Sequence, residues 1–168
     1  MRFADVGTGS GCIAIALLHN LPAWQAWAID LSSPALEVAR LNAERIGVND
    51  RIRFVCADML ECFAARPAFD FIVSNPPYGA RDDMESVQAM VRDYEPEVAV
   101  FGGESGFEAY WRLIPQARER LARGGYLVLE VGFTQSEEVA RNAEREGFVV
   151  DRVVEDLQGI PRCIVARI

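Results

Sequence analysis

Short apolar segments alternate along the chain with longer segments whose apolar positions follow a helical spacing. Apolar runs of strand length occupy residues 2–6, 24–29, 52–57, 69–74 and 126–131. Helical patterns occupy residues 12–21, 34–46, 107–121 and 136–145. Strands and helices that alternate in this way are joined by crossover connections, so the pattern predicts an α/β fold, a parallel sheet with helices on both faces.

The end of the chain departs from this alternation. Residues 148–154 and 162–168 are two strand-like runs with no helical pattern between them. The connection over 155–161 is too short for a crossover between parallel neighbours, which needs about a dozen residues. We therefore expect these two strands to pair as an antiparallel hairpin, which completes a mostly parallel sheet of seven strands.

Two helices carry recognisable end signals. Ser33 is expected to cap the helix over 34–46, with Pro34 at the first helical position and Gly47 closing it. The helix over 107–121 is expected to end at the Gly124-Gly125 pair.

Residues 79–106 show no clear periodicity and follow the strongest motif of the chain, described below. Acidic side chains recur in this segment: Asp82, Asp83, Glu85, Asp93, Glu95 and Glu97. Loops of this length in a compact domain are usually functional or mobile, and we favour a functional role here. The alternative is a solvated connection with one short helix over 85–91.

Length and composition favour one globular domain. The chain has 168 residues, 51% hydrophobic and 25% charged, which allows a sizeable core. No apolar run is long enough to span a membrane, and the start does not resemble a signal peptide. The net charge is −8 and all 17 basic residues are arginine, so we do not expect nucleic acid to be the partner of this chain. These features predict a cytoplasmic protein.

The residues that usually bind zinc are few and scattered. The cysteines stand alone at Cys12, Cys56, Cys62 and Cys163, and His19 is the single histidine. No metal site is therefore predicted. The cysteines are expected to be small buried residues in a reducing compartment.

A glycine-rich turn, Asp5-Val6-Gly7-Thr8-Gly9-Ser10-Gly11, lies between the first predicted strand and helix. Glycines let the backbone turn tightly and approach a ligand, and the helix N-terminus behind them offers free N–H groups. The dinucleotide pattern G-x-G-x-x-G would require glycine where Cys12 stands. The spacing G-x-G-x-G fits S-adenosylmethionine better than NAD.

Two acidic residues follow the next two strands. Asp30 ends the second strand, where a carboxylate can accept hydrogen bonds from ribose hydroxyls. Asp58 and Met59 follow the third strand, where they are candidates to accept from the adenine amine and to pack on the base. The alternatives are a helix-capping role for Asp30 and an ordinary strand-end role for Asp58.

The strongest motif is Ser74-Asn75-Pro76-Pro77-Tyr78, at the end of the fourth strand. Two prolines end a central strand and fix a rigid extended turn where ligands bind in such sheets. The Asn75 side-chain carbonyl and the Pro76 backbone carbonyl are both acceptors, so a planar NH₂ group could donate one hydrogen bond to each. Tyr78 offers a flat face to an amide or a base. The alternative is a tight turn with an exposed tyrosine.

In this order and spacing, the motifs resemble class I methyltransferases of the HemK/PrmC type, which are protein-(glutamine-N5) methyltransferases. The resemblance covers nearly the whole chain and has three further parts: Val91-Arg92-Asp93-Tyr94-Glu95-Pro96, Gly124-Gly125-Tyr126-Leu127-Val128-Leu129-Glu130 and Asp156-Leu157-Gln158-Gly159-Ile160-Pro161-Arg162. Many members carry an aromatic residue where Met59 stands. The family's N-terminal helical domain has no counterpart here, so we expect one catalytic domain over 1–168.

The resemblance implies a Rossmann-like fold, S-adenosylmethionine as cofactor and a peptide chain release factor as substrate, at the glutamine of a Gly-Gly-Gln sequence. The cofactor would be lined by Gly7, Thr8, Gly9, Ser10, Gly11, Asp30 and Met59, with Asp58 and Asn75 added from the residues themselves. The substrate glutamine would be held by Asn75, Pro76, Pro77 and Tyr78, among which Asn75, Pro76 and Tyr78 are the candidate catalytic residues.

Three alternatives remain open from the sequence. A DNA or RNA amino-methyltransferase would use the same motif, because adenine N6 and guanine N2 are also planar NH₂ groups. A glutamine methyltransferase acting on a ribosomal protein would share the catalytic residues. A cofactor-binding module without activity is the third.

Overall fold

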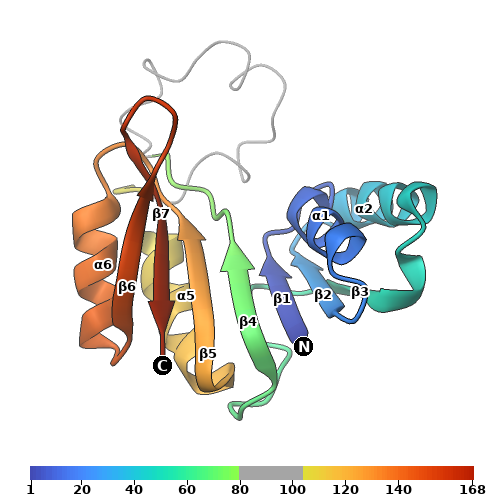
Figure 1. The fold of residues 1–168 in the computed structure, drawn as a ribbon, viewed down its shortest axis with the longest axis horizontal. Helices are drawn as coiled ribbons and strands as arrows, with labels where there is room; N and C mark the ends of the chain where they lie inside the picture. Colours follow the sequence, from blue (N-terminus) through green and yellow to red (C-terminus); the bar gives the residue numbers. More distant parts are fainter. Residues whose placement is uncertain (80–103) are drawn as a thin grey trace.

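A computed structural model describes residues 1–79 and 104–168 of the chain, in which seven strands form one sheet (Figure 1). The strands are β1 Arg2–Val6, β2 Gln25–Asp30, β3 Ile52–Cys56, β4 Phe69–Ser74, β5 Leu121–Glu130, β6 Val149–Glu155 and β7 Pro161–Arg167. Their order across the sheet is β3-β2-β1-β4-β5-β7-β6. The predictions for residues 80–103, including the acidic residues and the short helix, lie outside the described residues.

Strand directions follow the sequence-based expectation. The strands β3, β2, β1, β4 and β5 are parallel neighbours, with Ala4 of β1 between Trp27 of β2 and Ile72 of β4. The strands β6 and β7 form an antiparallel hairpin, and β7 pairs antiparallel with β5. This confirms a mostly parallel sheet that ends in a hairpin. The carboxyl ends of the parallel strands lie at the upper edge of the sheet in Figure 1, and both chain termini lie at the lower edge.

Helices cover both faces of the sheet, as predicted. The helices α1 Cys12–Asn20 and α2 Ser33–Ile46 lie on one face, and α5 Glu108–Arg120 and α6 Ser136–Arg145 lie on the other. Successive residues of a strand point to opposite faces. Phe3 of β1 accordingly packs with residues of α1, whereas Ala4 and Val6 pack in a second core with residues of α5 and α6.

Two predicted element ends are corrected by the structure. The cap of α2 is Ser32, not Ser33, and its hydroxyl oxygen accepts a hydrogen bond from the Ala35 N–H. The strand β5 begins at Leu121, and the Gly124-Gly125 pair lies inside it rather than between helix and strand. Leu121 already pairs with Phe69 of β4, and the following residues bulge before pairing resumes.

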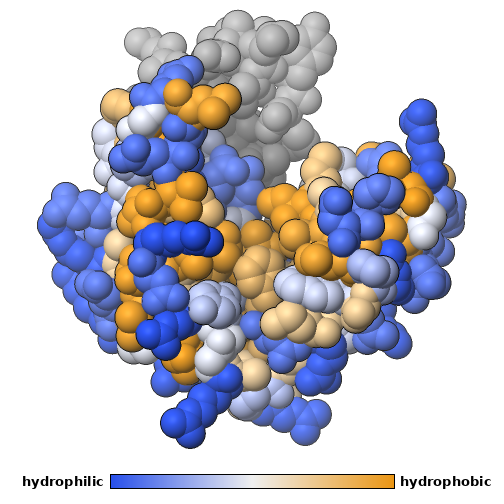
Figure 2. Space-filling model, in the orientation of Figure 1, coloured by the Kyte–Doolittle hydropathy of each residue, from blue (hydrophilic) through white to orange (hydrophobic). Residues whose placement is uncertain are grey.

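One part of the sheet face is hollowed. A hollow of about 400 Å³ is lined by Ile13, Val73, Ser74, Val128, Glu130, Asp156, Arg162 and Cys163. Figure 2 shows apolar side chains gathered between the β6–β7 side of the molecule and α1. The hollow reaches the carboxyl end of β4, where the Asn-Pro-Pro-Tyr motif begins.

Among the helices of the described residues, none is long and apolar enough to cross a membrane.

Candidate active site

The glycine-rich turn and the Asn-Pro-Pro-Tyr motif meet at the carboxyl edge of the sheet. The strands β1 and β4 are neighbours, so the segments that follow them start side by side. The buried Ser74 hydroxyl donates to the Val6 carbonyl oxygen at 2.7 Å and joins the two strand ends. A Cβ placed on Gly7 would lie 3.8 Å from the backbone oxygen of Asn75. Two motifs that the sequence predicts to form one site are thus adjacent.

The glycine-rich turn depends on left-handed backbone conformations. Gly7, Gly9 and Gly11 have φ angles of 69°, 57° and 84°, a region that side-chain-bearing residues rarely adopt. At Gly11, an added Cβ would lie 2.8 Å from Ile15 Cδ1 and 3.1 Å from Ala39 Cβ. At Gly9, an added Cβ would meet no atom within 4 Å. Gly11 therefore serves packing between helices, whereas Gly9 borders open space.

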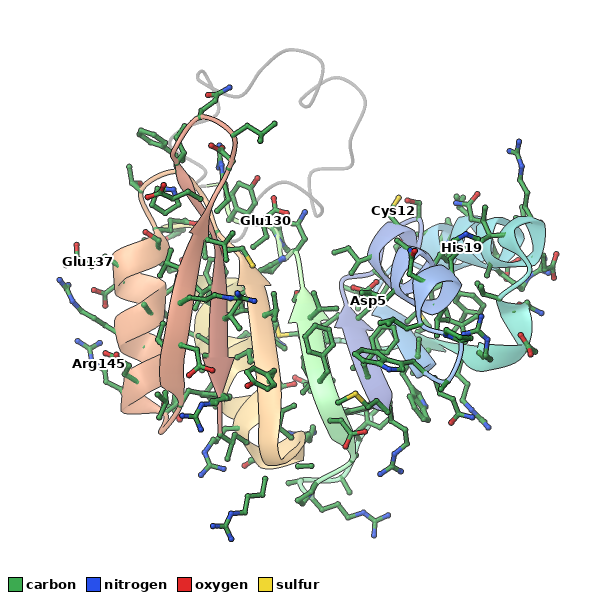
Figure 3. The ribbon with its side chains drawn as sticks, viewed as in Figure 1. Asp5, Cys12, His19, Glu130, Glu137 and Arg145 are labelled. Atoms are coloured by element: carbon green, nitrogen blue, oxygen red, sulfur yellow. The ribbon has the colours of Figure 1, made fainter. Side chains whose placement is uncertain are left out.

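A buried carboxylate anchors this turn. Asp5 Oδ2 accepts from the Thr8 hydroxyl at 2.7 Å and from the Ala14 N–H at 3.0 Å. Burial raises the pKa of Asp5 to about 6, with a contribution from the nearby negative charge of Asp30 and against the lowering effect of the two hydrogen bonds. The other oxygen, Oδ1, is buried without a hydrogen-bond partner among the described residues. Figure 3 places Asp5 between β1 and the start of α1.

Asp30 connects the glycine-rich turn to the end of β2. Its Oδ2 accepts from the Gly9 N–H and its Oδ1 accepts from the Ser32 N–H, both at 2.8 Å. A carboxylate oxygen can accept two hydrogen bonds, so each oxygen retains capacity for a ligand hydroxyl. Asp30 is half-buried and Leu31 beside it is 60% exposed.

Asp58 and Met59 lie beyond β3. Arg112 of α5 donates to Asp58 Oδ2 at 2.6 Å and to Glu61 Oε1 at 3.1 Å. Met59 has a positive φ of 49°; such backbone strain costs roughly 1–2 kcal/mol and often occurs at ligand sites. Sequence reasoning missed Arg112, because no local pattern links it to Asp58.

The Asn-Pro-Pro-Tyr motif presents its residues at different depths. Asn75 is exposed and its side chain makes no hydrogen bond within the described part of the chain, whereas Pro76 is buried. Pro77 and Tyr78 are half-buried, and the Tyr78 hydroxyl lies 3.5 Å from Glu130 Oε1 at the end of β5. Figure 3 shows Glu130 at the upper edge of the sheet.

Comparison with known proteins agrees with this arrangement. The sequence model described as "Methyltransferase small domain" matches residues 1–98. The chain belongs to the methyltransferase small domain family. The chain is 46% identical over 167 residues to the release factor glutamine methyltransferase of Bradyrhizobium diazoefficiens and 41% identical over 163 residues to that of Koribacter versatilis. These relatives confirm the resemblance to the HemK/PrmC type.

These relatives are longer than the chain. The alignments cover 99% and 97% of the chain but 56% and 57% of the two relatives. A bifunctional methyltransferase of Rickettsia conorii is 37% identical, with 98% of this chain and 31% of the relative covered. The chain thus spans just over half the length of the release factor glutamine methyltransferases that it matches.

Solved structures confirm the fold of the chain. TrmN from Thermus thermophilus superposes with a TM-score of 0.71 at 29% identity, covering 99% of this chain and 43% of that one. The ribosomal protein L11 methylase of Lactobacillus delbrueckii subsp. bulgaricus also gives a TM-score of 0.71, at 24% identity, with 99% and 70% covered. The Rossmann-like class I fold predicted from the motifs is therefore present.

The cysteines differ from the sequence-based expectation. Cys12, Cys56 and Cys62 are exposed and Cys163 is half-buried, all as free thiols. The expectation that they are buried was wrong: Cys12 begins α1, Cys56 ends β3, Cys62 lies in the connection between β3 and β4, and Cys163 is near the start of β7. Within the described residues, no group of three or more histidine, cysteine or acidic side chains could hold a metal ion.

Proposed function

We propose that this chain transfers a methyl group from S-adenosylmethionine to the side-chain amide nitrogen, N5, of a glutamine, and that its substrate is the Gly-Gly-Gln sequence of a peptide chain release factor. Two relatives that match nearly the whole chain are named release factor glutamine methyltransferases, which supports this substrate. The observation that carries the proposal is that the glycine-rich turn and Asn75 lie side by side at the ends of β1 and β4, which the Ser74–Val6 hydrogen bond joins. A methyl donor and a planar amine could meet there.

The residues of the glycine-rich turn fit this cofactor. The open space above Gly9 leaves room for a ligand against the backbone. The unpartnered Oδ1 of Asp5 fits a site that is completed by a ligand or by water, since buried acceptors are normally satisfied. Gly7, Thr8, Gly9, Ser10 and Gly11 would hold the methionine part, and Asp30 would accept from the ribose hydroxyls through its free lone pairs.

At the adenine end of the proposed site, Asp58 already accepts a hydrogen bond from Arg112. Asp58 shares its Oδ2 with Arg112, so its remaining oxygen Oδ1 would accept from the adenine amine. Met59 and the exposed Leu31 would offer apolar surface to the base. Bound there, the cofactor would supply an activated methyl group and depart as S-adenosylhomocysteine.

The chemical contribution of the chain would be positioning. An amide nitrogen is a poor nucleophile because its lone pair is delocalised into the carbonyl group. Asn75 Oδ1 and the Pro76 carbonyl would accept the two N–H bonds and aim the nitrogen, while Tyr78 and Pro77 flank the flat amide. Alignment of this kind can contribute roughly 7–11 kcal/mol, and acceptor dipoles favour the positive charge that grows on nitrogen. The proton would then leave to water, so no general base is assigned.

The test uses the 168-residue chain, labelled cofactor and three substrates: a release factor, a Gly-Gly-Gln peptide and the same peptide with asparagine in place of glutamine. Mass spectrometry should find one added methyl group on the glutamine and none on the asparagine peptide. Arms with a ribosomal protein and with duplex DNA and hairpin RNA are included. Methylation of a nucleic acid instead, with no labelled glutamine, would overturn the proposal; cofactor binding without any transfer would favour an inactive module.

The remaining features of the proposal follow from the chemistry of the substrate. A release factor works with ribosomes, so the protein would act in the cytoplasm, and residues 1–168 would act as one catalytic domain. The net charge of −8 argues against nucleic acid as the main partner.

A further inference from the structure

A buried glutamine joins the Asn-Pro-Pro-Tyr motif to the rest of the molecule. Gln135 lies at the N-terminus of α6, and its side chain does not cap that helix. Its amide nitrogen Nε2 donates to the backbone carbonyl oxygens of Tyr78 and Gly106, at 3.1 Å each. Its oxygen Oε1 accepts from the Gly132 N–H at 3.1 Å and lies 3.3 Å from the Tyr110 hydroxyl.

These contacts use most of the hydrogen-bonding capacity of the side chain. A glutamine amide has two N–H donors and two acceptor lone pairs. Both donors and one lone pair have a partner here, and the other lone pair lies near the Tyr110 hydroxyl, whose single hydrogen is shared with the Glu130 carbonyl oxygen at 3.0 Å. Only this orientation of the amide places donors toward carbonyl oxygens and the acceptor toward an N–H and a hydroxyl. The arrangement lies in the interior, where an unsatisfied donor or acceptor costs about 1–3 kcal/mol, so the side chain is held in one position.

The partners of Gln135 come from separate parts of the chain. Tyr78 and Gly106 flank residues 80–103, Gly132 follows β5, and Tyr110 lies in α5. Packing adds to the hydrogen bonds: a Cβ on Gly132 would lie 2.7 Å from Gln135 Oε1 and 3.2 Å from Tyr78 Cδ2. The tyrosine ring, the glycine and the glutamine amide are therefore in close contact, and a change in one displaces the others.

We propose that Gln135 is a positioning residue for the methyl transfer: by holding the Tyr78 carbonyl and packing beside its ring, it keeps residues Asn75 to Tyr78 in the conformation that grips the substrate amide. The Asn75 side chain makes no hydrogen bond within the described residues. The turn that carries it is fixed by Ser74 at one end and by Tyr78 at the other. This inference rests on the function proposed above.

The substitution Gln135→Glu tests this role with almost no change in shape. A carboxylate keeps the acceptor side toward Gly132 and Tyr110 but presents a second oxygen to the carbonyls of Tyr78 and Gly106. Only the protonated carboxyl group can donate one of the two lost hydrogen bonds. Burial raises the pKa of such a group, as does negative charge nearby. The titratable groups that face it among the described residues are Glu130 of β5, Tyr110 of α5 and Tyr78.

Steady-state kinetics of methylation should show a specific pattern. For Gln135→Glu at about pH 8, we expect kcat to fall about 10–100-fold, as is typical when a supporting hydrogen bond of a site is lost. The dissociation constant of the cofactor should stay unchanged, because within the described residues no hydrogen bond joins the glycine-rich turn to Gln135 or to its partners. The ratio of variant to wild-type kcat should rise as the pH is lowered to about 6, where the introduced group begins to accept a proton.

Tyr110→Phe is the matched control. It removes a hydroxyl from the acceptor side of the same amide but leaves both donor contacts with Tyr78 and Gly106. We expect kcat to change little and to show no recovery at low pH, even if the melting temperature falls as much as in Gln135→Glu. Equal loss of kcat in the two variants would show a general loosening of the region and would overturn the positioning role.

A second measurement reads the position of Tyr78 without turnover. In protein labelled with 3-fluorotyrosine, the Tyr78 resonance is assigned through Tyr78→Phe. Gln135→Glu should shift this fluorine resonance at about pH 8 and return it toward the wild-type position at about pH 6. An unchanged Tyr78 resonance would overturn the inference, whether or not the enzyme is active. A wild-type chain that methylates no glutamine would overturn the proposed function alone.

Discussion

The two halves of the carboxyl edge of the sheet are built in different ways. On the β1–β2 side, each carboxylate has at least one oxygen that already accepts hydrogen bonds from the chain: Asp5 Oδ2 accepts from Thr8 and from the start of α1, and Asp30 Oδ2 accepts from Gly9. On the β4–β5 side, the Asn75 side chain is exposed and makes no hydrogen bond with the described residues. Its backbone is instead fixed from behind by Ser74 and Gln135.

This difference corresponds to two kinds of ligand. A cofactor that binds tightly and in one pose is served by a turn whose shape is set before binding, so that little ordering entropy is lost. A substrate amine that binds only briefly needs hydrogen-bond acceptors that are not already engaged and whose backbone is held in place, as Ser74 and Gln135 hold the turn that carries Asn75. The comparison implies that substitutions on the first side change stability and cofactor affinity, whereas substitutions on the second side change kcat.

The largest effect is expected for Asn75→Ala. Loss of one oriented acceptor at the reacting nitrogen should lower kcat about 10²–10³-fold, by analogy with the loss of one donor from an oxyanion hole. Cofactor affinity, measured by isothermal titration, should be largely kept. Asn20→Ala on α1, an exposed asparagine whose side chain donates to the Ala16 carbonyl oxygen, is the control and should behave as wild type. Equal losses of cofactor affinity and kcat in Asn75→Ala would place Asn75 in the cofactor half instead.

Asp5→Asn should change how stability depends on pH. The pKa of Asp5 is raised from 3.8 to about 6, which corresponds to about 3 kcal/mol of folding free energy. Between these values the folded protein holds a proton that the unfolded chain has released. The contribution of Asp5 to stability is therefore full below about pH 4 and is lost as the pH rises through about 6.

The variant has no carboxyl group at this position, and its amide oxygen can still accept from Thr8 and Ala14. The difference in free energy of unfolding, variant minus wild type, should grow by about 3 kcal/mol between about pH 4 and about pH 7, because only the wild type loses stability over this range. Urea denaturation at several pH values measures this difference. Asp50→Asn, at a side chain that is 79% exposed, should leave the wild-type pH dependence intact. Parallel pH curves for wild type and Asp5→Asn would contradict the raised pKa.

How much of this site the sequence predicts depends on how far apart the interacting residues lie along the chain. The strands and the turns that follow them could be predicted because alternation and glycine or proline signals are local. Arg112 and Gln135 could not, because they act on Asp58 and Tyr78 across 54 and 57 residues. Their roles exist only once α5 and α6 have packed against the sheet.

The errors at element ends have local causes. Two consecutive serines precede Pro34, and either could cap the helix; the hydroxyl of Ser32 reaches the Ala35 N–H. The start of β5 was missed because Gly124 turns the chain with a φ of 76° inside the strand. A pairing partner in β4, which the sequence does not reveal, extends the strand back to Leu121.

Gly11→Ala and Gly9→Ala should separate packing from binding within the first half. Both place a side chain in a left-handed conformation, which costs about 1 kcal/mol. Gly11→Ala also forces Cβ toward Ile15 and Ala39, so the total loss of stability should be about 2 kcal/mol. Gly9→Ala should lose only the conformational part but weaken cofactor binding more, because its Cβ points into open space beside the proposed ligand. Equal affinities for the cofactor in the two variants would argue against a ligand over Gly9.

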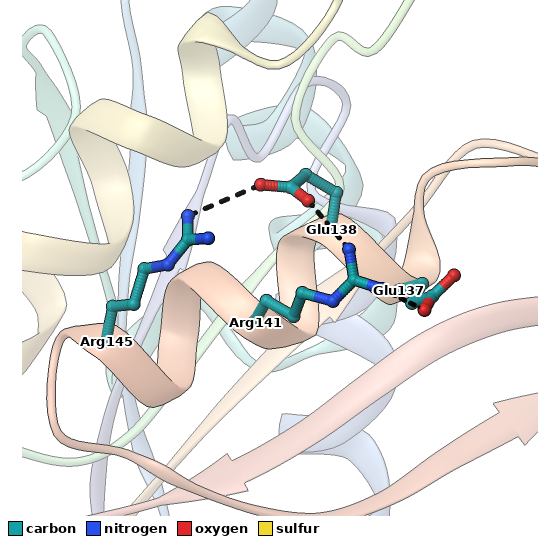
Figure 4. A network of polar contacts seen from close by, with 4 residues as sticks. All are labelled: Glu137, Glu138, Arg141 and Arg145. Atoms are coloured by element: carbon teal, nitrogen blue, oxygen red, sulfur yellow. Dashed lines mark hydrogen bonds and ion pairs between the residues drawn. The ribbon is translucent and has the colours of Figure 1, made fainter.

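The smallest effect is expected far from this edge, on the exposed surface of α6. Arg141 pairs there with Glu137 and Glu138, and Glu138 also pairs with Arg145 (Figure 4). The Arg141 side chain is 52% exposed, and exposed pairs at this helical spacing contribute about 0.3–0.5 kcal/mol because water and salt screen them. A double-mutant cycle of Glu138→Ala and Arg141→Ala, followed by urea denaturation, should give a coupling of this size that shrinks at high salt. Activity should be unaffected, since Gln135 one residue before α6 is held by the interior and not by this network. A clear loss of kcat in Arg141→Ala would mean that the surface of α6 sets the position of Gln135. The residues that position Asn75 would then include exposed residues of α6.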